Sequence, residues 1–225
     1  LYATDIAKKN DRLTIGNLDL KPEKNNYFSL SAEYVHERFS VSVNAFYNNI
    51  RDMIDYNTIA TGDKAMEQYG HKEVRQRDNI AEAKVHGINV SANAYLGAGF
   101  NLSGGYTHLN TQDVELEQPI DKSIKNAYNI NAQWAHSWKI YRLNINLNGR
   151  FNSKRFSKSY GYAPEYQLWD LNTRHSFNLK SVIIEPGCGM ENLFDYMDDR
   201  PYNSNYATLT PGRSFYISLS LKFKS

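Results

Sequence analysis

The feature of this sequence that most constrains its fold is an alternation of apolar and polar residues with a period of two. Near the end of the chain, apolar residues occupy every second position from Phe215 to Phe223, with mostly polar residues between them. Such a period predicts a β-strand with one apolar and one polar face. The segment 141–151 shows the same pattern and is longer than the five or six residues of an average strand. In a membrane barrel, the apolar face of such a strand meets lipid and the polar face meets the lumen.

The same alternation recurs along the chain and predicts about nine strands. They lie at 27–34, 39–47, 80–96, 100–108, 128–134, 141–151 and 166–178, around Pro186, and at 215–223. Tight turns near 36–38, 96–99, 137 and 179–181 alternate with long loops at 57–79, 110–122, 152–165 and 196–212. Short turns on one side and long loops on the other are typical of outer-membrane barrels. We therefore predict an all-β fold, an antiparallel transmembrane β-barrel whose tight turns are periplasmic.

Two further details of the pattern bear on this fold. The apolar phase shifts by one residue at Gly87, which predicts a β-bulge in the strand 80–96. Nine strands in an open sheet would also leave two unpaired edges in hydrocarbon, where each unsatisfied backbone group costs several kcal/mol. We therefore expect this chain to be an incomplete portion of a barrel.

Composition excludes several classes of protein. The chain holds 17 Tyr and 10 Phe among 225 residues, which is too many aromatic residues for a disordered segment. No apolar run approaches the roughly 20 residues that a membrane-spanning helix needs. The mean hydropathy of −0.64 fits a membrane barrel, in which alternate residues face water. Basic residues are scattered among acidic ones, with a net charge of +2, so we expect no nucleic-acid partner.

No arrangement of residues predicts catalysis or a metal site. The histidines lie far apart, and none has the spacing of a metal site: His36, His71, His86, His108, His136 and His175. We expect most of them to be structural or interfacial. No Gly-x-Ser-x-Gly motif precedes a helix. We therefore expect a protein that is not an enzyme, with no bound metal and no permanent cofactor.

One polar row is expected to line the inside of the barrel. It alternates with apolar residues along a single strand and consists of Arg142, Asn144, Asn146, Asn148 and Arg150. Polar side chains in a barrel lumen must hydrogen-bond to water or to whatever fills the lumen. We expect this row to contact a domain that fills the barrel rather than a solute.

Aromatic and basic residues in the long loops are the candidates for ligand binding. They are Met66, Tyr69 and His71 in the first loop, Arg155, Tyr160 and Tyr162 in the third, and Tyr202, Asn203, Asn205 and Tyr206 in the last. Tyrosine and histidine suit an iron porphyrin, and arginine with tyrosine suits an anionic chelate. For each residue the alternative is that it only packs the rim of its loop. Together they predict a wide aromatic mouth without identifying its ligand.

Three segments resemble those of the TonB-dependent outer-membrane receptors. The segment 191–196, Glu-Asn-Leu-Phe-Asp-Tyr, followed by Pro211-Gly212-Arg213 and the last strand, resembles the end of those receptors. The segment 16–23 is similar to their Asn-Pro-Asp/Asn-Leu-Lys-Pro-Glu sequence, with Leu18 in place of the usual proline. The segment 79–88 resembles a family strand of pattern Asn-x-x-x-Ala-x-x-x-Gly-Val-Glu, although Asn89 replaces the acid. The resemblance covers essentially the whole chain.

The resemblance implies a barrel of 22 strands preceded by a plug domain and a TonB-binding segment. Residues 1–225 would then be the C-terminal part of the barrel, with the plug and the N-terminal strands outside this chain. The implied function is TonB-dependent uptake of a large, scarce nutrient across the outer membrane of a Gram-negative bacterium. Its ligand would be a ferric siderophore or haem, or alternatively cobalamin. The implied partners are outer-membrane lipid, the TonB complex, the receptor's own plug domain and, as an option, a surface lipoprotein.

Two other classes of protein remain as alternatives. A soluble all-β binding module, such as a lectin-like sandwich, would have shorter strands and buried apolar faces. An outer-membrane lipase or protease would need a hydrolytic site at the barrel rim. The chain begins at Leu1, which indicates a fragment or a processed piece, and Lys224 and Ser225 follow Phe223 where family members usually end on an aromatic residue.

Overall fold

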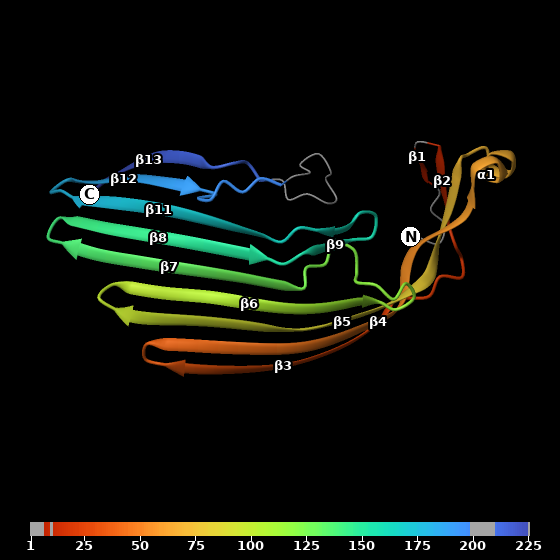
Figure 1. The fold of residues 1–225 in the computed structure, drawn as a ribbon, viewed down its shortest axis with the longest axis horizontal. Coiled ribbons are helices and arrows are strands. Elements are labelled where there is room, and N and C mark those ends of the chain that lie inside the picture. Colours follow the sequence, from red (N-terminus) through yellow and green to blue (C-terminus); the bar gives the residue numbers. More distant parts are fainter. Residues whose placement is uncertain (1–6, 10, 199–209, 225) are drawn as a thin grey trace. The chain divides into compact units, whose positions relative to one another are not determined.

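The computed structural model describes residues 7–9, 11–198 and 210–224, and these form a predominantly β structure with one short helix, α1 (Gly62–Tyr69) (Figure 1). Nine long strands are present in this described part of the chain: β3 (Lys24–His36), β4 (Phe39–Thr61), β5 (Glu73–Gly97), β6 (Phe100–Asp113), β7 (Asn126–Trp138), β8 (Tyr141–Asn152), β11 (Tyr166–Asn178), β12 (Val182–Glu191) and β13 (Ser214–Phe223). The all-β fold and the nine expected strands are therefore confirmed. No helix among these residues is long and apolar enough to cross a bilayer.

Each long strand pairs with the next one along the chain, from β3 to β13. The strands from β6 onward are antiparallel to their neighbours. Two short N-terminal strands, β1 (Ala7–Lys9) and β2 (Arg12–Ile15), form a hairpin, and β2 adds to β5 in parallel. The chain divides into two compact units: unit 1 holds Leu1–Phe28, Tyr47–His86 and Thr111–Ile120, and unit 2 holds the remainder.

The strand register in unit 2 keeps the two faces of its sheet chemically separate. On one face, Leu147 of β8 lies between Ala132 of β7 and Leu171 of β11. One residue along on the other face, Asn146 lies between Gln133 and Asn172. Because side chains alternate across a strand, this register gathers apolar residues on one face and amides on the other.

The expectation of a patternless loop at 57–79 was wrong. In unit 1, β4 continues to Thr61, α1 follows it, and β5 already begins at Glu73. Two apolar side chains of this segment, Ala65 and Val74, are fully buried, which explains why it is ordered. Because only these separate side chains are buried, the sequence of this segment shows no long alternation from which its structure could be predicted.

Gly87 lies in β5 at a point where neighbouring strands come very close. A Cβ atom there would overlap the carbonyl oxygen of His108 on β6 and would lie 3.1 Å from the ring of Phe46. Only glycine fits this position without moving a backbone. Strand β5 runs through Gly87 unbroken, and the bulge expected there stays a prediction.

The end of the chain is tied to the tight turn between β11 and β12. The Lys224 backbone N–H donates to the Ser181 carbonyl at 3.1 Å, and Lys224 Nζ donates to the Leu179 carbonyl at 2.7 Å. Lys224 therefore extends the pairing of the last strand by one residue beyond Phe223.

Candidate functional site

The apolar face of unit 2 is uncovered. Leu219, Ile217 and Phe223 on β13 are between 67% and 88% exposed, and Leu30 on β3 is 77% exposed. In the described part of the chain, the buried apolar side chains are few: Ala65, Val74, Ala83, Ala163 and Leu168. A soluble sandwich would instead bury one face of each sheet in a shared core. The expected exposure of the apolar face, which distinguishes a barrel wall from a soluble module, is thus observed.

An aromatic cluster lies on this apolar face at the end with the tight turns. The Trp138 ring lies 4.3 Å from that of His136 and stacks on Tyr141 at 5.6 Å. Tyr141 in turn lies 5.0 Å from Phe177, and Trp134 lies 5.9 Å from Phe100. These residues come from four adjacent strands, so they form a band across the sheet. Trp134, Trp138 and Tyr141 thus lie together near the tight turn between β7 and β8.

A second aromatic cluster lies on the same face toward the long-loop end. Tyr106 stacks on Tyr128 with ring centroids 4.6 Å apart, and Tyr128 lies 5.6 Å from Phe151. On β8, ten residues separate Tyr141 of the first band from Phe151 of the second. Ten residues span about 33 Å of strand, and at the tilt of about 40° that is typical of membrane barrels this length would leave about 25 Å between the bands. This spacing equals the apolar height of an outer-membrane barrel, flanked by two aromatic girdles.

The opposite face of unit 2 carries a network of amides. Asn131 Nδ2 donates to Asn148 Oδ1 at 2.5 Å, and Asn148 Nδ2 donates to Asn146 Oδ1 at the same distance. The expected lumen row lies wholly on this face. Its members Arg142, Asn144 and Asn146 line a hollow of about 480 Å³, and Asn148 and Arg150 line another of about 370 Å³.

Glu185, which lines the larger of these two hollows, forms an ion pair. Lys222 Nζ lies 2.6 Å from Glu185 Oε2, and Ser176 Oγ donates to the other carboxylate oxygen at 3.3 Å. Arg174 and Gln133 also line this hollow. Amides and hydroxyls both donate and accept, so this face offers hydrogen bonds to a polar surface laid against it.

A small hairpin brings together the loop candidates Arg155, Tyr160 and Tyr162. It consists of β9 (Arg155–Ser157) and β10 (Gly161–Ala163), where a loop was expected. Arg155 pairs with Ala163, and Tyr162 pairs with Phe156. Gly161 has φ of +79°, a conformation that a turn of this kind requires and that glycine adopts readily. The side chains of Tyr160 and Tyr162 are 49% and 55% exposed.

The candidates from the first loop belong to unit 1. Tyr69 ends α1 and His71 follows it, so both lie in unit 1, as does Met66. Both Tyr69 and His71 are partly buried. Tyr202, Asn203, Asn205 and Tyr206 lie outside the described residues.

Sequence reasoning missed an arginine and tyrosine cluster in unit 1. Two guanidinium groups lie over the ring of Tyr56 on β4, with the Cζ of Arg77 4.7 Å and that of Arg75 5.3 Å from its centre. Arg77 Nη2 also donates to the Tyr56 hydroxyl at 2.9 Å. Such stacking is favourable because the ring face is negative. The available signal was the spacing of Arg75 and Arg77, which puts both on one face of a strand.

An ion pair fastens β2 to β5 in the same unit. Arg12 Nε lies 2.8 Å from Glu73 Oε2. The hydrogen bond from Arg12 holds the pKa of Glu73 below its ordinary value, although partial desolvation opposes the shift. The bond joins residues that are 61 positions apart in the sequence.

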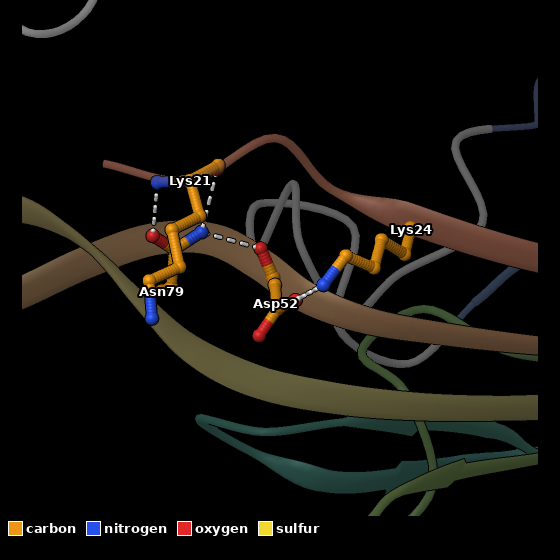
Figure 2. Close-up of polar contacts among 4 residues, drawn as sticks. All are labelled: Lys21, Lys24, Asp52 and Asn79. Atoms are coloured by element: carbon orange, nitrogen blue, oxygen red, sulfur yellow. Dashed lines mark hydrogen bonds and ion pairs between the residues drawn. The ribbon is translucent and has the colours of Figure 1, made fainter. Parts of the chain in front are cut away.

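Two of the sequence motifs meet at Asn79 (Figure 2). Its Oδ1 accepts the Lys21 backbone N–H at 2.7 Å, and its Nδ2 donates to the Lys21 carbonyl at 2.9 Å. The same Nδ2 donates to the Asp52 carbonyl at 2.6 Å, and the Asp52 carboxylate pairs with Lys24 Nζ at 3.2 Å. Asp52 itself has φ of +56° inside β4. The motif residues thus hold backbone segments in place.

Several of the histidines lie in aromatic contacts. His36 stacks on Phe39, His86 on Tyr47, and His136 on Trp134. Across the described residues, no group of three or more His, Cys, Asp or Glu side chains is placed to hold a metal ion.

A family model matches most of this sequence. The model described as "TonB dependent receptor-like, beta-barrel" covers residues 2–193. A curated relative, the probable TonB-dependent siderophore receptor PiuA of Acinetobacter baumannii, is 28% identical over 162 residues. That match covers 64% of this chain but only 21% of the relative.

Solved structures share the fold. The ferric preacinetobactin receptor BauA of Acinetobacter baumannii has a TM-score of 0.68 at 17% identity, and the match covers 90% of this chain and 30% of BauA. The copper transporter OprC has a TM-score of 0.67 at 14% identity, covering 91% of this chain and 32% of OprC. This chain therefore spans about a third or less of the length of each protein that it resembles.

Proposed function

This chain belongs to the TonB-dependent receptor β-barrel family, and from that premise we propose that it forms the C-terminal part of a receptor barrel that imports a ferric siderophore. The family is one of receptors and not of enzymes. The observation that carries the proposal is the family match over a sheet with one uncovered apolar face. On this reading residues 1–225 are one part of the barrel, and the plug and earlier strands belong to other segments of the receptor.

The proposed location is the outer membrane of a Gram-negative bacterium. The two aromatic bands, about 25 Å apart, support a membrane of ordinary thickness between them. The tight turns after β3, β5, β7 and β11 would then face the periplasm, and the long connections would face outward. Lipid is the proposed partner of the apolar face.

The polar face is proposed to contact the plug domain. Arg142, Asn144, Asn146, Asn148 and Arg150 supply donors and acceptors that a polar plug surface needs. Energy for import would come from the TonB complex through a segment that this chain does not contain. A surface lipoprotein as a further partner stays a prediction.

The ligand is proposed from the relatives and from the loops. PiuA and BauA are named as receptors for siderophores, whereas OprC is named as a copper transporter. The residues proposed to contact the ligand are Tyr69, His71, Arg155, Tyr160 and Tyr162, together with Tyr202 and Tyr206. Haem and cobalamin remain alternatives, and each would be carried as a transported ligand rather than a cofactor.

Uptake by the complete receptor tests this proposal. A strain that expresses it should import radioactive iron from a ferric siderophore, and import should stop when TonB is deleted or when the proton gradient is collapsed. Parallel measurements with haem and with cobalamin distinguish the three ligands. Import that continues after TonB is deleted would contradict the proposal. So would a receptor whose gel migration does not change on heating, because folded membrane barrels migrate differently before and after heating.

A further inference from the structure

Two neighbouring tight turns of unit 2 each carry an exposed lysine. Lys139 lies in the turn between β7 and β8, and Lys180 lies in the turn between β11 and β12. Both turns are at the same end of the sheet (Figure 1). The Asn178 backbone N–H donates to the Ile140 carbonyl at 2.7 Å, so a hydrogen bond joins the two turns directly.

A third lysine is fastened to the second of these turns. The Lys224 backbone N–H donates to the Ser181 carbonyl at 3.1 Å, and Lys224 Nζ donates to the Leu179 carbonyl at 2.7 Å. Leu179 directly precedes Lys180, so two lysines belong to this one turn. We call Lys139, Lys180 and Lys224 the lysine cluster.

No carboxylate of these segments balances the lysine cluster. The segments that carry it contain no acidic residue: 137–141, 178–182 and 223–225. Glu185, the acidic residue nearest to them in the sequence, is paired with Lys222, whose Nζ lies 2.6 Å from its Oε2. Within the described part of the chain, neither Lys139 nor Lys180 has an ion-pair partner. Like charges that lie close together repel, so an anion bound at the cluster would stabilise it.

Exposed apolar side chains adjoin the lysine cluster. Four of them are next to a cluster lysine in the sequence and are between 39% and 81% exposed: Trp138, Ile140, Leu179 and Phe223. The Trp138 indole N–H has no hydrogen-bond partner among the residues that the structure describes. A soluble anion would use only the charges. A phospholipid would place its phosphate at the lysines and its acyl chains on the apolar side chains.

We propose that the lysine cluster binds the head groups of anionic phospholipids in the leaflet that the tight turns face. The inference rests on the proposed membrane location and adds the class of lipid. The three ammonium groups attract the phosphate, and the Trp138 indole N–H donates to a phosphate or ester oxygen. A phosphatidylcholine head group carries its own cation and is neutral overall, so it gains much less from the cluster than phosphatidylglycerol does.

The test measures which lipid stays on the complete receptor. The receptor is placed in nanodiscs of equimolar phosphatidylglycerol and phosphatidylcholine, and the lipids that it retains on release are counted by native mass spectrometry. Phosphatidylglycerol should be retained at least about tenfold over phosphatidylcholine. High salt should reduce this preference. Glycerol 3-phosphate, which has the phosphate without acyl chains, should not displace the retained lipid.

Matched variants separate the cluster from the overall charge of the protein. Lys139→Gln, Lys180→Gln and Lys224→Gln should each lower the preference by about threefold to fivefold. Glutamine at position 224 can still donate to the Leu179 carbonyl, so this variant removes only the charge. Lys64→Gln removes an exposed lysine of α1 in unit 1 and should retain lipid like the unaltered receptor. Heat-modifiable gel migration shows that each variant has folded.

The outcomes distinguish the inference from the function on which it rests. Equal retention of the two lipids by the folded receptor overturns the inference and leaves siderophore import standing. A preference that Lys64→Gln lowers as much as the cluster variants do overturns the cluster as the site. Displacement of the lipid by glycerol 3-phosphate makes the ligand a soluble phosphate and overturns the lipid. A receptor that does not enter the nanodiscs and imports no iron from any siderophore overturns both.

Discussion

The Asn79 side chain pairs with the backbone of Lys21 as a neighbouring strand would, since its Oδ1 accepts the Lys21 N–H at 2.7 Å and its Nδ2 donates to the Lys21 carbonyl at 2.9 Å. A third bond runs from Nδ2 to the Asp52 carbonyl at 2.6 Å. One amide therefore fastens the segment before β3 to two strands at once. This pairing needs both a donor and an acceptor on a short side chain, a requirement that asparagine meets and aspartate does not.

Replacing Asn79 should release the segment 16–24. Asn79→Ala removes three hydrogen bonds, which should cost about 1–3 kcal/mol of local stability. Asn79→Asp should cost at least as much, because a carboxylate would face the carbonyls of Lys21 and Asp52. Hydrogen exchange of the complete receptor, followed by mass spectrometry, should show faster exchange confined to this segment. Asn101→Asp, at an exposed position in β6, provides the control. Unchanged exchange in both Asn79 variants would contradict this role.

The aromatic band at the tight turns should contribute measurably to stability. Trp138 contacts His136 and Tyr141, and it is 45% exposed on the apolar face. Trp138→Ala should lower the free energy of unfolding by about 1–3 kcal/mol because two ring contacts disappear. Trp138→Phe keeps a ring in place and should lose less than half as much. Urea unfolding of the receptor in lipid vesicles measures both, and equal losses would show that ring contacts are not the cause.

The number of strands could be predicted from sequence because each face of unit 2 meets its own environment. Apolar and polar residues such as Leu147 and Asn146 alternate whatever strand lies next to theirs. The alternation can therefore be recognised in the sequence before the pairing register is known. The five residues from Arg142 to Arg150 could be placed together on one polar face for the same reason, because they alternate along a single strand. The tight turns were equally visible, because they interrupt the alternation for only two or three residues.

Unit 1 could not be predicted in this way. Its order comes from single contacts between distant residues, such as Arg12 with Glu73, and from the burial of Val74 and Ala65. Tyr56 meets Arg77 only because β4 and β5 lie side by side in a particular register, which no periodicity encodes. The sequence predicts a loop in place of the β9–β10 hairpin because its strands are three residues long, too short to show an alternation.

Acid should loosen β2 from β5. Arg12 holds the pKa of Glu73 below its ordinary value of 4.5, so the ionised form is favoured in the folded protein. Its stabilising contribution is therefore complete above the ordinary pKa and is lost as the pH falls through the lowered value. Hydrogen exchange of Arg12–Ile15, corrected for the intrinsic effect of pH, should rise only once the pH falls below the ordinary pKa of a glutamate. Glu73→Gln should exchange faster at neutral pH and show no such rise. A midpoint near neutrality would point to another group.

Leu147 and Asn148 provide the most direct test of the two faces. They are adjacent in β8, but Leu147 lies opposite Ala132 on the apolar face, whereas Asn148 lies opposite Asn131 on the amide face. Leu147 also falls between Tyr141 and Phe151, and therefore between the two aromatic bands. An arginine at position 147 would have to enter the hydrocarbon near its middle.

Leu147→Arg should therefore make folding into lipid vesicles less favourable by about 2–4 kcal/mol, the cost of arginine at the midplane of a barrel wall. Asn148→Arg places the same side chain one residue along, where water and the Asp170 carboxylate are near, since Asp170 pairs with Asn148 across the sheet. It should cost only about 1 kcal/mol, because the two amide hydrogen bonds of Asn148 are lost while the arginine gains the nearby Asp170 carboxylate. Because the two variants share strand, charge and size, the difference between them measures only which face each residue occupies. A larger loss at position 148 would reverse the two faces, and the proposed membrane orientation of the whole sheet would fall with them.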